Sequence, residues 1–282
     1  MSAGKVAKPC CCRPTRHTLR AHWPGYCDGS DPCGGRKAAR CRVGLHQRVS
    51  FSHAVLVTGG NGFVGSAVCR AALSKGLHVI SVNRSGRPNL KGDWVDKVVW
   101  VKADTLEKEQ WSSHLEGVKG VVACVGGFGS NEVMKKICGS TNVAAAEAAK
   151  QGGVERFAFI SAHDYKLPFL LSGYYEGKQM AEKTVKDLFG QNGASLRPGF
   201  IYGDRVVGDK VIKLGLIGKP LSAVTQLLPK SITTLPFISA ALLPPVPVEA
   251  VANTAVGFVL GEVQPSNTEE MRFSVYDILK NA

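Results

Sequence analysis

Two kinds of apolar run alternate along residues 52–203. Short, nearly continuous apolar runs rich in β-branched residues are typical of strands covered on both faces. Longer stretches with apolar positions three and four residues apart predict helices between them. This alternation indicates an α/β fold with a doubly wound parallel sheet, and we find no internal repeat. The expected strands are Ala54–Thr58, His78–Val82, Lys97–Val101, Gly120–Val125, Arg156–Ile160 and Ala194–Arg197, and the expected helices are Phe63–Ser74, Glu132–Gln151, Tyr174–Leu188 and Val248–Leu260.

The pattern changes after Gly203. Residues 231–248 form an 18-residue stretch without a charge, and prolines at 236, 244, 245 and 247 interrupt any helix there. We therefore expect no transmembrane helix. Two interpretations stay open: a buried connection inside a small C-terminal substrate subdomain, or a surface that meets a membrane or a lipophilic substrate.

The charge of the chain is concentrated in its leader. The whole chain of 282 residues carries +13, but residues 1–50 hold ten Lys/Arg and two Asp, and six of the nine cysteines. A basic segment poor in acids fits an organelle-targeting peptide, with the mitochondrion favoured over the chloroplast. Scarce serine and abundant cysteine fit it badly, so a disordered tail or a wrongly assigned start codon stays an alternative. The body is only mildly basic, and we expect no nucleic-acid partner and no metal site.

A glycine-rich turn follows the first strand. Residues 58–65 read Thr-Gly-Gly-Asn-Gly-Phe-Val-Gly, with glycines at 59, 62 and 65. Such spacing lets the chain turn sharply, lets backbone approach a diphosphate, and lets the next helix pack against the strand. The helix N-terminus then points its unpaired N–H groups at the phosphates. The turn predicts a dinucleotide site, although a glycine loop without a ligand is the alternative. The expected boundaries are therefore a leader at 1–51, a nucleotide-binding Rossmann domain at 52–203, and a substrate-side segment with a C-terminal helix at 204–282 that completes the same domain.

The end of the second strand bears on the choice of cofactor. No acid stands there to accept hydrogen bonds from ribose hydroxyls, whereas Arg84 and Arg87 flank a serine and a glycine. Guanidinium groups pair with phosphate, which favours NADP(H) over NAD(H), unless both are solvated loop charges. Asp104 either meets the adenine amine or caps its own strand end. The expected cofactor-binding residues are Gly59, Asn61, Gly62, Phe63, Val64, Gly65, Arg84, Arg87, Asp104, Val125, Gly126, Gly127 and Lys178.

Ser161, Tyr174 and Lys178 are the expected catalytic residues. Tyr174 and Lys178 are four residues apart and share one face of a helix. Hydride addition to a carbonyl builds negative charge on oxygen, so a positioned acid must supply a proton. A neighbouring ammonium favours phenolate, so Lys178 would lower the pKa of Tyr174 from about 10. Lys178 would also hold the nicotinamide ribose, and the hydroxyl of Ser161 would hydrogen-bond the developing oxyanion.

Several alternatives weigh against this interpretation. The helix could be exposed, with Lys178 merely pairing with Glu182. Asn142 either supports the site from the preceding helix or is an ordinary polar residue. His163 and Asp164 lie near Ser161, but the chain lacks the Gly-x-Ser-x-Gly elbow of a hydrolase, so we reject that mechanism.

In this order, the turn at 59–65, Ser161 and the Tyr174–Lys178 pair resemble the short-chain dehydrogenase/reductase family. Residues 196–203, Leu-Arg-Pro-Gly-Phe-Ile-Tyr-Gly, are similar to its extended and atypical branch. The loop Val-Gly-Gly-Phe-Gly at 125–129 and the segment at 83–88 resemble plant and algal organelle members. These are similar to a dehydrogenase-like accessory subunit of respiratory complex I and to a fungal coenzyme Q biosynthesis protein. The resemblance covers roughly residues 53–260.

This resemblance implies an oxidoreductase that uses NADP(H) in preference to NAD(H) on a small or lipophilic carbonyl or quinone-related compound. The alternative is a non-catalytic cofactor-binding accessory protein of a mitochondrial membrane complex or of coenzyme Q biosynthesis. A redox-sensing regulator is a third class. Peripheral association with a membrane or a membrane complex fits the accessory role best.

Overall fold

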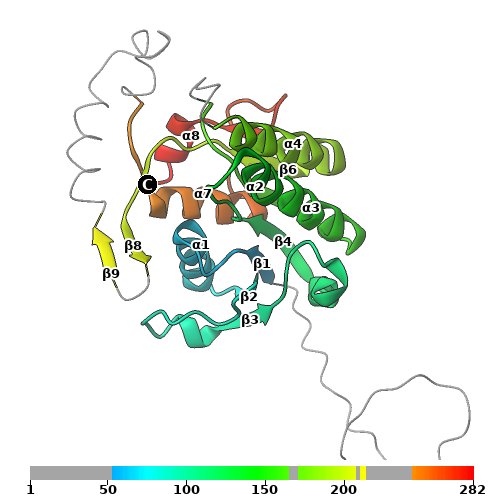
Figure 1. Cartoon of the computed structure of the whole chain (residues 1–282), viewed down its shortest axis with the longest axis vertical. Helices are drawn as coiled ribbons and strands as arrows, with labels where there is room; N and C mark the ends of the chain where they lie inside the picture. The colour runs from blue at the N-terminus through cyan, green and yellow to red at the C-terminus, as the bar shows by residue number, and fades with distance from the viewer. Residues whose placement is uncertain (1–52, 165–170, 208–209, 214–242) are drawn as a thin grey trace, which may run out of the picture. The chain divides into compact units, whose positions relative to one another are not determined.

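The computed structural model describes residues 53–164, 171–207, 210–213 and 243–282. The predicted leader and residues 231–242 of the uncharged stretch lie outside this part of the chain. Seven parallel strands form the main sheet in the order β11-β6-β5-β4-β1-β2-β3 (Figure 1). They are β1 (Ala54–Thr58), β2 (His78–Asn83), β3 (Val98–Lys102), β4 (Val118–Ala123), β5 (Arg156–Ile160), β6 (Gly193–Leu196) and β11 (Arg272–Phe273). The predicted doubly wound α/β class is confirmed.

Helices cover both faces of this sheet (Figure 1). They are α1 (Phe63–Ser74), α2 (Asn131–Lys135), α3 (Thr141–Gln151), α4 (Ser172–Phe189), α7 (Val248–Leu260) and α8 (Val275–Leu279), with short 3₁₀ turns at Val95–Lys97, Lys108–Gln110, Ser112–Leu115 and Gly190–Asn192. Two short pairings lie outside the sheet: β7 (Ile201–Tyr202) runs parallel to β10 (Val246–Pro247), and β8 (Asp204–Val207) antiparallel to β9 (Lys210–Lys213). None of the helices in the described ranges is long and apolar enough to cross a bilayer.

Strand β1 shows how the sheet separates two cores. Val55 and Val57 belong to a buried cluster with α1 and α7, whereas Ala54 and Leu56 belong to a second cluster with α3 and α4. Alternate residues of a strand point to opposite faces, so a strand between two helical layers needs apolar residues at every position. All five residues of β1 are accordingly buried.

The helix expected over Glu132–Gln151 is interrupted. The structure has α2, then a π-helical turn η4 (Lys136–Ser140), then α3. The side-chain amide of Asn142 donates to the carbonyl of Cys138 at 2.9 Å and to that of Ile137 at 3.4 Å, so a side chain takes part in the helical hydrogen bonding. Single π turns of this kind are frequent at functional sites, and helix propensity alone does not reveal them.

Glycines let α4 approach the α2–η4 segment at backbone distance. A Cβ on Gly173 would lie 2.0 Å from the carbonyl oxygen of Asn131, and one on Gly177 would lie 2.9 Å from the amide nitrogen of Gly139. Both positions are buried. This close approach holds α4 in place beside the carboxyl end of β5.

We predict that Gly173→Ala destabilises the protein by about 1–3 kcal/mol because the added methyl overlaps backbone that cannot move independently. Alanine has the higher helix propensity by about 1 kcal/mol, so a loss of stability is the opposite of the local expectation. Urea unfolding measures the effect, with Gln179→Ala on the exposed side of α4 as the control. A stability equal to that of the control would contradict the proposed tight packing.

Candidate functional site

The turn between β1 and α1 is fixed by its own backbone. Gly59 has a φ of +75°, a conformation that favours glycine, and its N–H donates to the carbonyl of Val82 at 2.9 Å. A Cβ on Gly65 would lie 2.1 Å from the carbonyl oxygen of Gly59. The first turn of α1 therefore packs directly on the loop.

The start of α1 fits the diphosphate of a dinucleotide. Gly62 is the N-cap residue and no side chain caps the helix, so the first N–H groups keep their capacity for an anion. The carboxyl end of β4 also lies close to this turn, because a Cβ on Gly59 would lie 3.3 Å from the side chain of Val125. The turn, the helix start and the β4 end thus form one cradle of bare backbone.

The end of β2 carries polar groups beside the same turn. The amide of Asn61 donates to the hydroxyl of Ser85 at 2.7 Å, which joins the two loops. Arg84 is exposed. Arg87 is also exposed and forms an ion pair with Asp96. Asp104 accepts from the backbone N–H of Leu106 at 3.0 Å, the strand-end arrangement expected as its alternative role.

The loop after β4 is held from behind by the α2–η4–α3 segment. Asn142 is fully buried and donates to the carbonyl of Val125 at 3.0 Å, and the thiol of Cys138 donates to the carbonyl of Gly127 at 3.4 Å. The Oδ1 atom of Asn142 has no hydrogen-bond partner among the described residues. Asn142 therefore supports the loop, which sequence reasoning had treated as the less favoured outcome.

Tyr174 and Lys178 lie on the inner face of α4, toward this loop. The Nζ atom of Lys178 lies 5.7 Å from the ring centroid of Tyr174, and a Cβ on Gly126 would lie 3.6 Å from the same Nζ. Lys178 is only 6% exposed, so the alternative of an exposed helix with a solvated Lys178–Glu182 pair is wrong. The structure thus brings Gly126, Lys178 and Tyr174 together.

The ammonium of Lys178 donates to the carbonyl of Ile160 at 2.6 Å and lies 4.7 Å from the ring centroid of Phe159. Burial lowers the pKa of Lys178 below the usual lysine value, and electrostatic interactions with Cys138, Cys124 and Glu182 act in the opposite direction. A lysine of this kind is sensitive to its charged neighbours, as functional lysines are.

Ser161 directly follows β5 and is 4% exposed. Its hydroxyl donates to Oε1 of Glu182 at 2.5 Å, and Arg197 binds both oxygens of that carboxylate at 2.8 and 2.5 Å. Sequence reasoning missed Glu182 and Arg197 as site residues. The spacing of Tyr174, Lys178 and Glu182, each four apart, was the signal that could have found Glu182.

Phe128 is a third residue to which sequence reasoning assigned no role in the site. Its ring stacks on Tyr174 with the centroids 5.5 Å apart and the planes 11° apart, while 73% of Phe128 remains exposed. Tyr175 meets Tyr174 edge to face at 5.4 Å. Tyr174 is thus held between two aromatic side chains at the mouth of the site.

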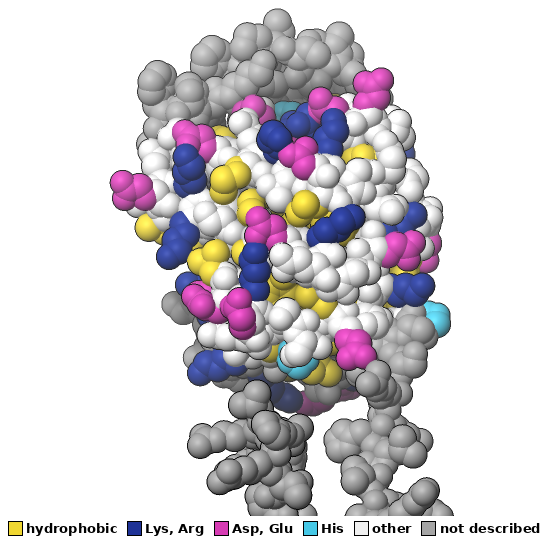
Figure 2. Space-filling model, turned by 90° about the vertical axis from the view of Figure 1, so that its right-hand side faces the viewer, with side chains coloured by type: hydrophobic (Ala, Val, Ile, Leu, Met, Phe, Trp, Pro, Cys, Tyr) yellow, Lys and Arg dark blue, Asp and Glu magenta, His cyan; other side chains and the backbone are white. Residues whose placement is uncertain are grey.

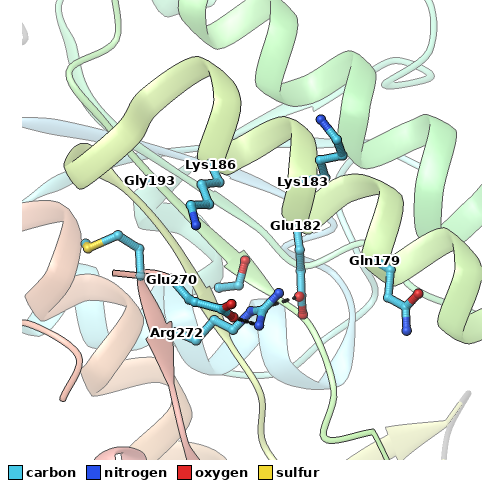
Figure 3. A pocket seen from close by; sticks show the side chains of 9 residues that line it. Gln179, Glu182, Lys183, Lys186, Gly193, Glu270 and Arg272 are labelled. Atoms are coloured by element: carbon cyan, nitrogen blue, oxygen red, sulfur yellow. Dashed lines mark ion pairs between the residues drawn. The ribbon is translucent and has the colours of Figure 1, made fainter. Parts of the chain in front are cut away.

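Glu182 is also reached from another side, through a pocket between α4, β6 and β11 (Figure 3). Figure 3 shows the carboxylate pointing toward the guanidinium of Arg272, whose Nε lies 3.4 Å from Oε2. Arg272 also pairs with Glu270. Basic and acidic groups are mixed in this pocket, and Figure 2 shows the same mixture over one face of the molecule, unlike the single-sign surface typical of nucleic-acid binding.

These features are typical of a dinucleotide-binding α/β protein, with a tyrosine–lysine pair beside the carboxyl ends of β4 and β5. The chain belongs to the NAD(P)H-binding family, whose profile matches residues 59–216. It is 45% identical over 213 residues to an uncharacterized chloroplastic protein of Arabidopsis thaliana, covering 74% of this chain and 72% of that one. It is 30% identical over 167 residues to the mitochondrial protein FMP52 of Chaetomium globosum, covering 54% and 67%.

A more distant relative is a 3-beta-hydroxysteroid dehydrogenase of Mycolicibacterium neoaurum, 28% identical over 194 residues that cover 58% of this chain and 52% of that one. Among solved structures, the enzyme WbmH of Bordetella bronchiseptica in complex with NAD+ superposes with a TM-score of 0.53 at 17% identity, covering 74% of this chain and 72% of that one. This likeness confirms the Rossmann fold.

We predict that the stability of the wild type rises relative to Lys178→Met as the pH increases from 7 toward the ordinary lysine pKa of about 10.4. The folded pKa is lowered, so the folded state loses the proton first and the cost of the buried charge disappears over that range. Chemical unfolding of both proteins at a series of pH values measures the difference. Lys183→Met, on the exposed side of α4, should show no such trend. A stability difference between the wild type and Lys178→Met that does not change with pH would refute the lowered pKa of Lys178.

Proposed function

We propose that this protein is an NADP(H)-dependent oxidoreductase that acts on a small or lipophilic carbonyl compound, quinones included. The observation that carries the proposal is the buried Lys178 ammonium beside Tyr174, next to Gly126 in the loop that follows β4. A nicotinamide cofactor, when bound, supplies the hydride. The chain must then position that cofactor, exclude water and supply a proton.

Tyr174 is the proposed proton donor. A phenol with a pKa near 10 is too weak an acid for fast transfer at neutral pH, and a nearby ammonium lowers that pKa by favouring phenolate. Lys178 stands at the right place on the helix for this role and for donating to the nicotinamide ribose. Its low exposure keeps water from screening its charge.

The proposed cofactor contacts follow the three strand ends. The amides of the Gly59–Gly65 turn and the start of α1 would hold the diphosphate. Arg87 pairs with Asp96, whereas the exposed guanidinium of Arg84 has no ion-pair partner within the described part of the chain, so Arg84 is the stronger of the two candidates for a 2′-phosphate. The loop at Val125–Gly127 would pass beside the nicotinamide half.

We also propose that the protein works in an organelle. The basic leader fits import, and the relatives are named as chloroplastic in Arabidopsis thaliana and mitochondrial in Chaetomium globosum. The Arabidopsis relative shares more of this chain, which favours the plastid. We expect residues 1–51 fused to a fluorescent protein to direct it to an organelle, and diffuse fluorescence throughout the cytosol would contradict the proposal.

We predict that Tyr174→Phe lowers kcat by about 10²–10⁴, the usual contribution of a positioned acid, while the Kd for NADPH stays within about twofold. The phenylalanine ring keeps the stack on Phe128, so only the hydroxyl is lost. The matched control is Tyr175→Phe, one residue further on, which should retain most of its turnover. A wild type that binds cofactor but turns over no carbonyl in a broad screen would favour the accessory alternative.

We predict that Arg84→Ala weakens NADP(H) binding about tenfold or more and leaves NAD(H) binding within about twofold, because only the former carries the phosphate that a guanidinium binds. Calorimetric titration of both cofactors measures this. Arg70→Ala on α1, whose guanidinium lies over Trp94, is the control for loss of a surface arginine. If Arg84→Ala weakened the binding of NADP(H) and of NAD(H) equally, the proposed preference for NADP(H) would lose its basis.

A further inference from the structure

The hydroxyl proton of Ser161 is already engaged. A serine has one such proton, and here it lies in a short bond to a carboxylate, with the Oγ and Oε1 atoms 2.5 Å apart. Ser161 and Glu182 are 4% and 6% exposed, so both partners of this bond are largely shielded from solvent. Donation to a reacting oxygen would break a charge-assisted bond between two buried groups, which is costly.

The carboxylate of Glu182 is itself held from two further strands. Arg197, which directly follows β6, binds both of its oxygens, and Arg272 on β11 reaches Oε2 at 3.4 Å. The hydrogen bond to Glu182 raises the pKa of Arg197, which keeps that guanidinium charged. A buried carboxylate with a bidentate arginine is fixed in orientation as well as in charge.

The same network clamps the end of β5 to α4 at two successive helical turns. Lys178 binds the carbonyl of Ile160 and Glu182 binds the side chain of Ser161, which is the next residue along the chain. The backbone N–H of Ser161 also donates to the carbonyl of Leu196 on β6 at 2.8 Å. Tyr174 lies one turn before Lys178 on this clamped face of α4.

We propose that Glu182 is a positioning residue of this site and that Ser161 acts through it: their buried bond fixes the end of β5 against the Tyr174–Lys178 face, and Ser161 does not donate to the reacting oxygen. The charge of Glu182 also supports the ammonium form of Lys178. The charged or titratable groups around Lys178 are Tyr174 and Glu182 on α4, Cys124 after β4 and Cys138 in η4. The proposal deepens the proposed function by reassigning Ser161.

The first test needs neither cofactor nor turnover. The pH at which Lys178 loses its proton is obtained by comparing the unfolding of proteins with Lys178 and with Lys178→Met, in the wild type and in a Glu182→Gln background. Glutamine keeps the size of Glu182 and an oxygen for Ser161 but removes the charge. We expect the midpoint to fall by about one pH unit, the size of effect that a nearby opposite charge produces.

The matched control for this test is Glu176→Gln on the same helix, since Glu176 is exposed and pairs with Lys135. It should leave the midpoint of Lys178 unchanged. An equal midpoint in the wild type and in Glu182→Gln would overturn the role of Glu182. A general loss of stability would lower the free energy of unfolding by the same amount at every pH, so it cannot be mistaken for a shift in the midpoint of Lys178.

The second test uses Ser161→Ala, which keeps the Glu182–Arg197 pair and so guards against a Glu182 variant that fails to fold. We expect kcat to fall less than about tenfold, whereas loss of an oxyanion donor costs about 10²–10³. A fall in the latter range would overturn the reassignment. The changes in unfolding free energy of Ser161→Ala and Glu182→Gln should not add up to that of the double variant, because the two side chains share one bond. Strict additivity would also count against the proposed role of that bond.

The two proposals fail in different ways. Absence of cofactor binding or of turnover in the wild type would refute the proposed function, while the midpoint and additivity measurements would still decide the role of Glu182. Normal turnover with an unshifted midpoint would refute only this inference.

Discussion

The ammonium group of Lys178 is enclosed between the sheet and α4, so the surrounding structure must supply hydrogen bonds and opposite charge to it. Burying a charge costs several kcal/mol, roughly, unless hydrogen bonds and opposite charges compensate. The carbonyl of Ile160 and the charge of Glu182 provide that compensation only if α4 lies close to β5. The glycines at 173 and 177 let α4 pack on the α2–η4 segment in this position, because any side chain there would meet the backbone of that segment. The packing of the helix and the chemistry of the site are therefore one requirement.

The local sequence pattern was sufficient to predict the elements around the glycine-rich turn. β1, α1, β5 and α7 have the predicted bounds, because each is a strong apolar run that ends at a clear break. The turn between β1 and α1 depends on backbone conformation, and glycine spacing reports backbone conformation directly. The helix expected at Glu132–Gln151 was wrong in its middle, since the π turn depends on contacts of Asn142 with its own helix and with the β4 loop. A propensity scale contains no information on such contacts.

The other half of the site could be predicted only in part. Spacing on one helix placed Tyr174 and Lys178 together, but the partners of Glu182 come from strands 15 and 21 residues away along the chain. The same limit applies to Arg87, whose pairing with Asp96 depends on how the loop after β2 folds back. Stacking of Phe128 on Tyr174 also joins two distant segments. The four-residue spacing after Lys178 places Glu182 on the same helix face, but a single sequence carries no pattern that pairs it with residues of other elements.

This division explains why the fold alone leaves the activity open. The diphosphate cradle consists of backbone and glycine, so proteins of this fold share it whether or not they catalyse a reaction. What decides the chemistry is the state of a few side chains: the charge on Lys178, the proton of Ser161 and the access of a ligand to Tyr174. In this protein the hydroxyl of Ser161 donates to Glu182, and the ring of Phe128 stacks on that of Tyr174. Under the proposed function, proton supply would depend on Tyr174 together with Lys178, whose ammonium form is supported by the carboxylate one helical turn further along α4.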